Sequence, residues 1–310
     1  MRHRIIALLS AIGVVAGMTA CDRTPAPLQD QGWVEVWEDT FDYASVSELD
    51  DEWLIGSFDF TTSPGQVQLL PSPLQEGDRM VRLTTSAAFG WSMANISTLG
   101  PKQTAEPNFP LAESWQGPLY VEALIRYTED PWALSSMFMY SHHKAEVFRP
   151  AGYTCSTPPA PQELTPEWDI MENAWHGHTT SQFDTTIHRN TVTSGGAWWC
   201  GVPDQDPSVG SPRHYRAKVP AADPLGNWHI WAGYWRADGQ LCTYLDDQLL
   251  HCDAAFDSFD QPLAINLFTA KFPSPMWWCG RPPAYPAACP PQPSEITMDI
   301  TNVRVLVPPA

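Results

Sequence analysis

The stretch Glu167-Trp168-Asp169-Ile170-Met171-Glu172 determines how the surrounding sequence is interpreted. It places three carboxylates among three large apolar residues, and this mixture is typical of a half-buried β-strand. In a regular strand, positions 167, 169 and 171 share one face, so Glu172 would point to the other side. One extra residue at Ile170-Met171, a β-bulge, would return Glu172 to the face of Glu167 and Asp169. We therefore predict a bulged strand with three carboxylates on one face.

The sequence on both sides of this stretch favours an all-β protein. No window of 12 or more residues has a clean helical period, and 31 prolines are spread along the chain. Proline inside a helix costs about 3 kcal/mol, so this density argues against a helical protein. Many short strands with turns between them predict a sandwich or a barrel. The expected strands are Met80–Thr85, Tyr120–Tyr127, Ser135–Tyr140, Glu167–Glu172, Phe183–Arg189, Trp228–Trp235, Leu241–Leu245, Leu263–Phe268 and Ile296–Val307.

Length and charge limit the class of the protein. A chain of 310 residues can form one large all-β domain, and we see no domain boundary after residue 33. The formal net charge of -18 should repel nucleic acid and anionic membrane surfaces. We therefore expect no nucleic-acid partner, and a neutral partner fits the charge better than an anionic one.

The N-terminus has the features of an export signal. Arg2 and Arg4 precede an apolar run, Ile5 to Val15, that is too short to span a bilayer comfortably. The run leads to Met18-Thr19-Ala20-Cys21, which resembles a bacterial lipobox. We predict a signal peptide at 1–20, and a lipidated Cys21 followed by a linker at 21–32. The protein would then be an exported cell-surface or periplasmic lipoprotein, attached to the membrane by its lipid alone. A plain secretory signal is the alternative.

The cysteine count agrees with lipidation of Cys21. The chain has seven cysteines, and removing Cys21 leaves an even number. Six cysteines can form three disulfides in an oxidising compartment, with 15 possible connectivities. Cys242 and Cys252 flank the expected turn Asp246-Asp247, so they could bridge one hairpin. The other four are Cys155, Cys200, Cys279 and Cys289.

The hexapeptide has the ExDxxE pattern, which resembles the signature of glycoside hydrolase family 16, the family of laminarinases and agarases. The resemblance extends over about residues 33–307 and implies a jelly-roll, concanavalin A-like sandwich of two antiparallel sheets, with the catalytic strand on the concave face. Further stretches occur in the family's order: Trp37–Phe41 with Leu49–Trp53 as the opening strand, Tyr120–Arg126, Ser135–Tyr140, Asn227–Trp235 with Tyr244–Asp246, Pro262–Leu267, and Met298–Val305 as the closing strand.

The resemblance assigns roles to the carboxylates. It implies that Glu167 is the nucleophile, that Glu172 is the general acid/base, and that Asp169 lies between them and tunes both. This chemistry needs one ionised and one protonated carboxylate at working pH. His188 matches a histidine on the neighbouring strand that contacts the catalytic acid in many members. A structural histidine is the alternative for this residue.

Tryptophans in turns and loops are candidates for sugar stacking, with core packing as the alternative. They are Trp132, Trp175, Trp198, Trp199, Trp277 and Trp278. Catalysis in this family needs no cofactor, but many members bind a structural calcium away from the cleft. Asp299 matches the closing-strand ligand for that calcium, and Glu38 or Asp39 would be its partner.

These inferences together predict a retaining endo-glycosidase that acts on a β-linked polysaccharide, and we expect a monomer. A β-1,3-glucan is the favoured substrate. A neutral galactan is the second, because Ala133-Leu134-Ser135-Ser136 resembles agarase-type sequences. A transglycosylase would use the same groups, with a sugar in place of water. A surface lectin on the same sandwich is the rival from another class, although a lectin has no need of all three carboxylates.

Overall fold

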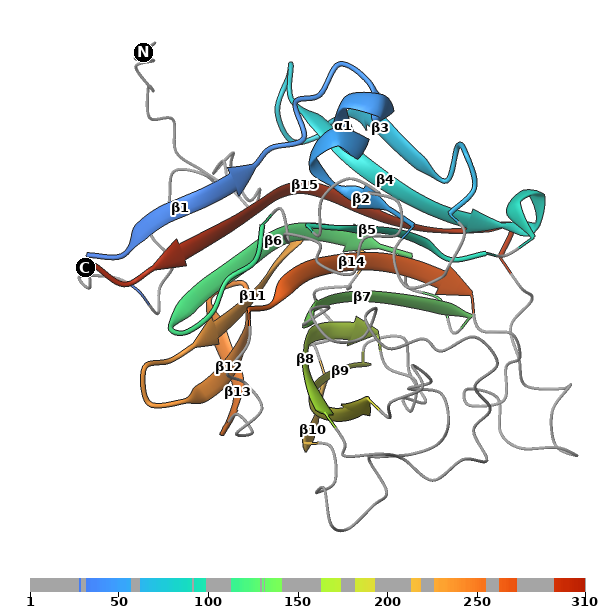
Figure 1. The fold of residues 1–310 in the computed structure, drawn as a ribbon. Coiled ribbons are helices and arrows are strands. Elements are labelled where there is room, and N and C mark those ends of the chain that lie inside the picture. The colour runs from blue at the N-terminus through green and yellow to red at the C-terminus, as the bar shows by residue number, and fades with distance from the viewer. Residues whose placement is uncertain are drawn as a thin grey trace, which may run out of the picture.

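Two antiparallel β-sheets pack face to face in the computed structural model of this chain (Figure 1). The structure describes residues 28, 32–56, 62–90, 92–98, 113–128, 130, 132–140, 163–173, 182–192, 213–218, 226–254, 262–271 and 293–309. This architecture is the predicted all-β jelly-roll sandwich, so the fold class expected from the sequence is confirmed. No helix among the described residues is long and apolar enough to cross a membrane.

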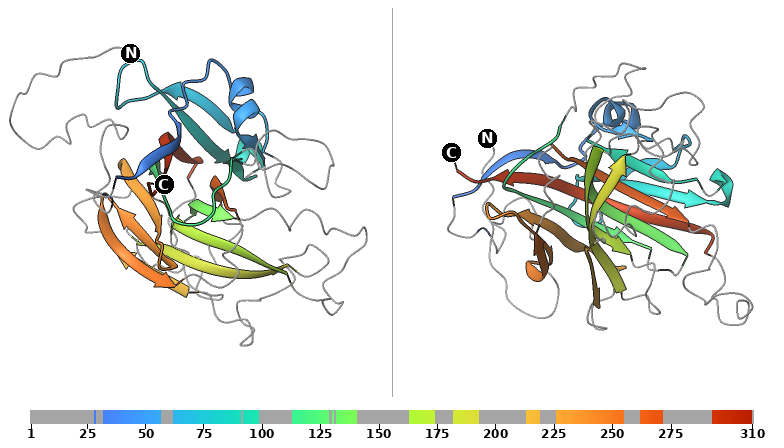
Figure 2. Two further views of the ribbon diagram at one scale, coloured as in Figure 1. Left: turned by 60° about the vertical axis from the view of Figure 1, so that its left-hand side comes forward. Right: turned by 60° about the horizontal axis from the view of Figure 1, so that its bottom comes forward.

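The first sheet, sheet A, joins strands from both ends of the chain. Its strands are β1 (Val34–Asp39), β3 (Val67–Pro71), β4 (Arg79–Ser86), β6 (Leu119–Tyr127), β11 (His229–Trp235), β12 (Gln240–Leu245), β13 (Gln248–Ala254) and β15 (Glu295–Val307). Their spatial order is β13-β12-β11-β6-β15-β4-β3, and β1 also pairs with β15. Figures 1 and 2 show β1 and β15 side by side. Strand β15 is therefore the central strand that connects the early and middle strands of sheet A.

The second sheet, sheet B, contains the carboxylate strand near its centre. Its strands are β2 (Leu54–Ile55), β5 (Ala94–Ser97), β7 (Ala133–Tyr140), β8 (Glu163–Asn173), β9 (Gln182–Val192), β10 (Arg213–Lys218) and β14 (Ala264–Lys271). Their order is β10-β9-β8-β7-β14-β5-β2. Each of the nine runs predicted as strands falls mainly within one observed strand, with ends that differ by a few residues.

One local prediction was wrong. Leu49–Glu52, expected to belong to the opening strand, lies in helix α1 (Val46–Glu52). The Ser45 hydroxyl accepts a hydrogen bond from the Glu48 amide at 3.2 Å, and the Glu48 carboxylate accepts one from the Ala44 amide at 2.8 Å. A Ser followed three residues later by Glu is a signal for the start of a helix. The helix was not predicted because its seven residues are too few to show a clear helical period. A 3-10 helix, η3 (Ala87–Phe89), follows β4.

The core lies between the two sheets and is formed mainly by every second side chain along their strands. On β6, Leu119, Val121 and Ala123 point inward, and Tyr120 and Glu122 lie on the outer face of sheet A. That outer face has its own apolar cluster, and Leu28 is completely covered by it. The cluster comprises Leu28, Tyr120, Ala232, Cys242, Tyr244 and Leu306, with Trp33, Tyr234 and Cys252 at its edge. The segment predicted as a linker thus includes one residue that packs on the sandwich.

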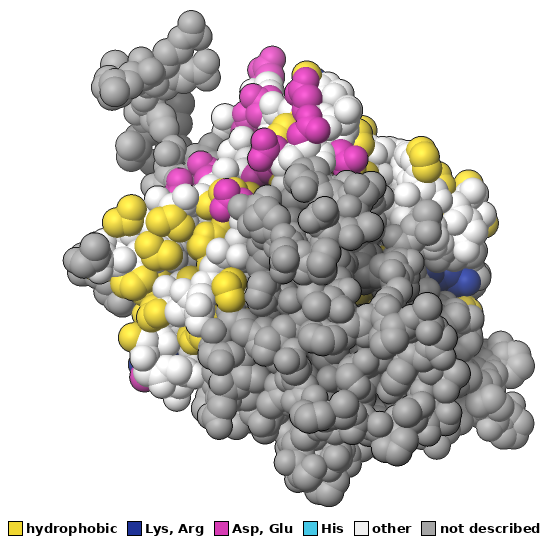
Figure 3. Space-filling view, in the orientation of Figure 1, with side chains coloured by type: hydrophobic (Ala, Val, Ile, Leu, Met, Phe, Trp, Pro, Cys, Tyr) yellow, Lys and Arg dark blue, Asp and Glu magenta, His cyan; other side chains and the backbone are white. Residues whose placement is uncertain are grey.

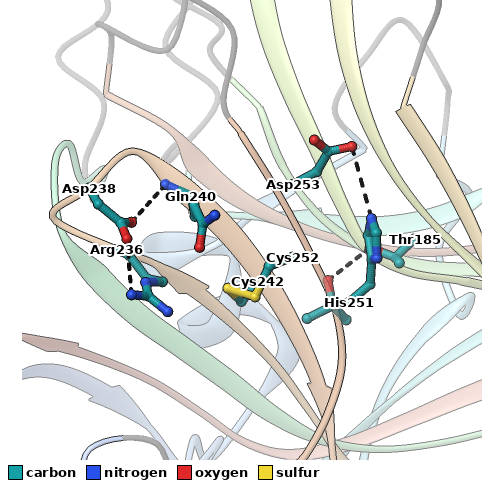
Figure 4. The surroundings of a disulfide bond; sticks show 9 residues. Thr185, Arg236, Asp238, Gln240, Cys242, His251, Cys252 and Asp253 are labelled. Carbon is teal, nitrogen blue, oxygen red and sulfur yellow. Dashed lines mark hydrogen bonds and ion pairs between the residues drawn. A yellow bond between two sulfur atoms is a disulfide. The ribbon is translucent and has the colours of Figure 1, made fainter.

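A disulfide joins the two strands of the β12–β13 hairpin. Cys242 and Cys252 lie opposite each other in register and are bonded, as their positions around the turn suggested (Figure 4). The turn residues Asp246 and Asp247 have φ values of 49° and 66°, the left-handed pair that a two-residue hairpin turn requires. The other five cysteines lie outside the described residues, so the three-disulfide expectation stays a prediction.

The two sheets approach each other closely at a glycine. A Cβ added to Gly233 of β11 would lie 2.5 Å from the Trp168 ring and 2.8 Å from Ile170 Cδ1, both on β8. Real Cβ atoms do not tolerate such distances. The missing side chain of Gly233 therefore makes the space into which the core face of the carboxylate strand packs.

We expect Gly233→Ala to destabilise the fold, because overpacking a filled core typically costs about 1–3 kcal/mol. Urea unfolding followed by tryptophan fluorescence measures the loss. Adding Trp168→Phe to the Gly233→Ala variant should recover part of it, since the smaller ring vacates the space that the new methyl group needs. A Gly233→Ala protein as stable as the wild type would contradict the close approach.

Candidate active site

The carboxylate strand β8 contains the predicted bulge. Against β7, Glu172 pairs with Ser136, Met171 with Met137 and Asp169 with Phe138, so Ile170 has no partner of its own. Against β9, the register also shifts between Asp169 and Glu172. The extra residue therefore lies at Ile170-Met171, where the ExDxxE pattern required it.

Burial shows the consequence of the bulge. Ile170 and Met171 are adjacent, yet both are completely buried in the core between the sheets, together with Trp168. Adjacent residues of a regular strand would point to opposite faces. Because both point inward, Glu172 returns to the side of Glu167 and Asp169. Glu167 and Glu172 are half-buried, and Asp169 is only 4% exposed.

The neighbouring strands place defined positions beside each carboxylate. Tyr140 of β7 and His188 of β9 lie on either side of Glu167 in the ladder. Asp184 of β9 is the neighbour of Glu172. The adjacent-strand placement expected for His188 is thus confirmed for its backbone, although its register partner is Glu167 and not the presumed acid Glu172. Its side chain lies outside what the structure describes, so its role stays a prediction.

Sequence reasoning missed an aromatic and polar surface on β7 and β14. Asn266 and Phe268 of β14 lie beside Phe138 and Ser136 of β7 in register. The Phe138 and Phe268 rings meet edge to face, with centroids 5.7 Å apart. Apolar partners at Met137 and Leu267 point into the core, so the alternate residues form the other face, next to the carboxylates. The signal was the period-two pattern of both strands, which becomes informative only when their register is known.

Two polar atoms on this surface are buried without a hydrogen-bond partner among the described residues. They are Ser136 Oγ and Asn266 Oδ1. Ser136 pairs with Glu172, and Asn266 pairs with Phe138, which in turn pairs with Asp169. The amide nitrogen of Asn266 donates to the Ala264 carbonyl at 3.1 Å, which leaves the oxygen as the acceptor. Buried polar atoms usually have a partner, so these two are suited to a bound hydroxyl group or water.

Trp132 lies immediately before β7, at a distance from the aromatic surface. It is four residues from Ser136, which corresponds to about 13 Å at roughly 3.3 Å per residue. The ammonium group of Lys271 lies over its ring, 5.3 Å from the centroid. Burial lowers the pKa of Lys271. The other tryptophans expected to stack on sugar, Trp175, Trp198, Trp199, Trp277 and Trp278, lie outside the described residues, as does Cys21.

Asp299 lies on the outer face of sheet A, and its contacts do not fit a calcium site. Arg82 binds both of its oxygens, at 2.7 and 2.9 Å, and Arg126 binds Oδ2 at 2.6 Å. The hydrogen bonds to Asp299 also raise the pKa of Arg82. A cation would have to displace two positive charges. Among the residues the structure describes, no three Asp, Glu, His or Cys side chains gather as metal ligands.

The expected calcium partners are also engaged elsewhere, and Glu38 accepts a hydrogen bond from the side-chain amide of Asn302 at 2.9 Å. Asp39 accepts hydrogen bonds from the Phe41 amide at 2.6 Å, and from the Tyr43 hydroxyl and the Trp53 indole at 2.5 Å each. Asp39 thereby fixes the loop between β1 and α1. It lines an acidic hollow with Trp37, Glu38, Thr40, Asp42, Tyr43, Glu52 and Glu113. Figure 3 shows Asp and Glu side chains gathered on the upper part of this face of the molecule.

We expect thermal unfolding of the exported protein to be insensitive to calcium and to chelators, because Asp299 is already neutralised by arginines. Asp299→Asn should lower stability by roughly 2 kcal/mol, as losses of charge-assisted hydrogen bonds do. Asp238→Asn is the matched control, since it weakens the exposed pair of Asp238 with Arg236 and should change little. A calcium-dependent rise in melting temperature that Asp299→Asn abolishes would contradict this assignment.

Known proteins resemble this chain in structure and not in sequence. No protein-family model matches the sequence, and no curated protein matches it. In structure, the chain is similar to the laminarinase catalytic domain of Thermotoga maritima, at 15% identity and a TM-score of 0.56, over 90% of this chain and 99% of that one. It is similar to the Rhodothermus marinus laminarinase at 18% identity and a TM-score of 0.53, over 90% and 98%.

A third similar structure is the κ-carrageenase of Pseudoalteromonas carrageenovora, at 12% identity and a TM-score of 0.54, over 92% of this chain and 99% of that one. At such identities the comparison concerns the arrangement of the strands alone. The chain therefore has the sandwich fold shared by bacterial laminarinases and a κ-carrageenase, with a bulged carboxylate strand in the second sheet.

Proposed function

We propose that the chain is a retaining endo-glycosidase of glycoside hydrolase family 16 that cleaves a β-linked polysaccharide. The observation that carries the proposal is the bulge at Ile170-Met171, which brings Glu167, Asp169 and Glu172 to one face of β8. A pair of carboxylates on one face is what glycosidic cleavage with retention requires, and Asp169 lies between the two. The shared fold with laminarinases agrees with this proposal.

In the proposed reaction, Glu172 protonates the leaving oxygen while Glu167 attacks the anomeric carbon. The glycosyl–enzyme ester is then hydrolysed by water, with Glu172 acting as base. Asp169 is buried between the two carboxylates, on the same face. Its position allows it to influence the protonation of both neighbours. No metal or cofactor takes part in these steps.

For the substrate, we propose a β-1,3-glucan. The described side chains beside the carboxylates on β7 and β14 are uncharged: Ser136, Phe138, Tyr140, Asn266 and Phe268. Phenyl rings suit the apolar faces of sugar rings. The oxygens of Ser136 and Asn266, for which the described part of the chain supplies no partner, suit sugar hydroxyls. With a net charge of -18, the chain is better matched to a neutral polymer than to an anionic one.

Two structural neighbours are named as enzymes of such a polymer, the endo-1,3-β-glucanases of Thermotoga petrophila and Pyrococcus furiosus. A neutral galactan is the second candidate. Reducing-end release on a panel of β-glucans and galactans separates the candidates, and product analysis by mass separates hydrolysis from glycosyl transfer.

We expect Glu167→Ala and Glu172→Ala each to abolish nearly all hydrolysis of polysaccharide, and to differ on an activated aryl glycoside supplied with azide. In Glu172→Ala the nucleophile remains and a good leaving group needs no acid, so azide should give a β-configured product. In Glu167→Ala azide can enter directly and should give an α-configured product. Proton NMR of the glycosyl azide distinguishes the two.

Glu113→Ala, in the acidic hollow away from β8, is the control and should keep wild-type activity. Exchanged azide products would reverse the two roles. Tight binding of a glucan or galactan by a wild-type protein with neither hydrolysis nor transfer would favour the lectin.

We also propose that the chain is an exported lipoprotein anchored through Cys21. Cys21→Ser should move the protein from the membrane fraction to the soluble fraction and leave its activity intact, because Cys21 lies seven residues before Leu28, the first of the described residues that packs on the sandwich. Fractionation followed by an activity assay tests this. Retention of the variant in the membrane fraction would indicate another anchor.

A further inference from the structure

The bulge leaves an irregular place in the hydrogen-bond ladder between β8 and β9. Asp169 pairs with Thr186, and Glu172 pairs with Asp184. The two bulge residues, Ile170 and Met171, therefore face a single residue of β9, Thr185. Bulges disrupt the ladder locally, so the backbone there needs another source of hydrogen bonds.

Thr185 supplies such a bond with its side chain. Its hydroxyl donates to the backbone carbonyl of Asp169 at 2.8 Å and lies 2.8 Å from the hydroxyl of Thr243. A hydroxyl has one hydrogen, and that of Thr185 is directed to the carbonyl. Thr243 must therefore be the donor of the second bond. The result is a two-step hydroxyl chain, from Thr243 to Thr185 to the carbonyl of Asp169.

This chain crosses the interior of the sandwich. Thr243 belongs to β12 of sheet A, and Thr185 to β9 of sheet B. Thr185 and Thr243 are 4% and 2% exposed, so water does not compete freely for the bonds. Figure 4 shows Thr185 reaching the hairpin that carries the Cys242–Cys252 disulfide. A hydrogen bond in this setting is stronger than at the surface, and its loss is more costly.

A second contact from sheet A fixes the same part of β8. Gly233 of β11 accommodates the Trp168 ring and Ile170, the residues before and after Asp169. Sheet A thus holds the backbone of Asp169 through packing on β11 and through hydroxyl bonds from β12. Both contacts act on the core side, opposite the carboxylates.

We propose that Thr185, supported by Thr243, is a positioning residue that holds the bulge in the conformation that presents Glu167 and Glu172 together. The inference rests on the proposed function. Without the hydroxyl, the carbonyl of Asp169 loses a donor inside the core, and the bulge relaxes. The separation of the two reactive carboxylates then changes, although neither threonine touches the substrate.

The experiment compares Thr185→Val, which keeps the shape and removes the hydroxyl, with Thr185→Ser, which keeps the hydroxyl. Steady-state kinetics on polysaccharide and on an aryl glycoside are measured well below each melting temperature. Thr185→Val should lower kcat on the order of 10²-fold with little change in KM, because misplacement of reacting groups by about 1 Å has that effect. Its pH–rate profile should also shift, while Thr185→Ser should stay near wild type in both respects.

Thr269→Val is the matched control. Thr269 forms another buried hydroxyl pair, 2.9 Å from Ser135, that joins β14 to β7 within sheet B. Its loss should reduce stability and leave kcat and the pH profile unchanged. Thr243→Val should lower kcat in the same way but by a smaller factor than Thr185→Val. The double variant should lower kcat by less than the product of the two single factors, because both threonines act through one hydroxyl chain. Wild-type kcat and pH profile in folded Thr185→Val would overturn the proposal.

Amide hydrogen exchange at Met171 and Glu172 tests the bulge without any assay of activity. Faster exchange there in Thr185→Val than in Thr269→Val supports the positioning role, and equal exchange overturns it. If the wild type hydrolyses nothing, the proposed function fails, while this exchange experiment still decides whether the hydroxyl chain holds the bulge.

Discussion

The insertion of one residue in β8 is the constraint on which the arrangement of this site depends. Trp168, Ile170 and Met171 must all be buried, while the carboxylates between and beside them must reach the opposite face. A regular strand cannot satisfy both demands, because its side chains alternate strictly. The bulge satisfies both demands but interrupts the regular backbone pairing of β8. Contacts on the core side hold the bulged backbone in place, through packing against Gly233 and through the hydroxyls of Thr185 and Thr243.

The buried and half-buried carboxylates of the chain lie in two different environments. On the outer face of sheet A, carboxylates are matched with donors: Asp299 with two arginines, and Glu122 with Arg304 at 2.7 Å and with the Tyr120 hydroxyl at 3.0 Å. Glu122 and Arg304 are 1% and 3% exposed, so each would be costly to bury alone. In sheet B, the carboxylates of β8 lie beside neutral residues of β7. The first group serves the fold, and the second is the group to which we assign the proposed reaction.

The sequence predicted the all-β class and the bulge from local patterns, whereas the jelly-roll arrangement came from the resemblance to glycoside hydrolase family 16. Alternation marks the strands, and two consecutive apolar residues between Asp169 and Glu172 require an extra residue. The aromatic and polar surface of Phe138 and Asn266 depends on the pairing of β7 with β14, which are more than 120 residues apart, and no local pattern specifies such a register. The arginines around Asp299 were missed for the same reason, since they lie on β4 and β6.

The position of β15 at the centre of sheet A has a consequence for how the chain folds. Strands β4 and β6 are made early but do not pair with each other, because β15 lies between them, and Val34 of β1 pairs with Val307. Contacts so distant in sequence slow folding, because the entropy of loop closure is lost before the contacts form. Sheet A cannot close until the segment around residue 300 has been synthesised. If a chain of this design were exported before folding, it would carry these strand edges unpaired, and such edges are prone to wrong pairing until β15 takes its place.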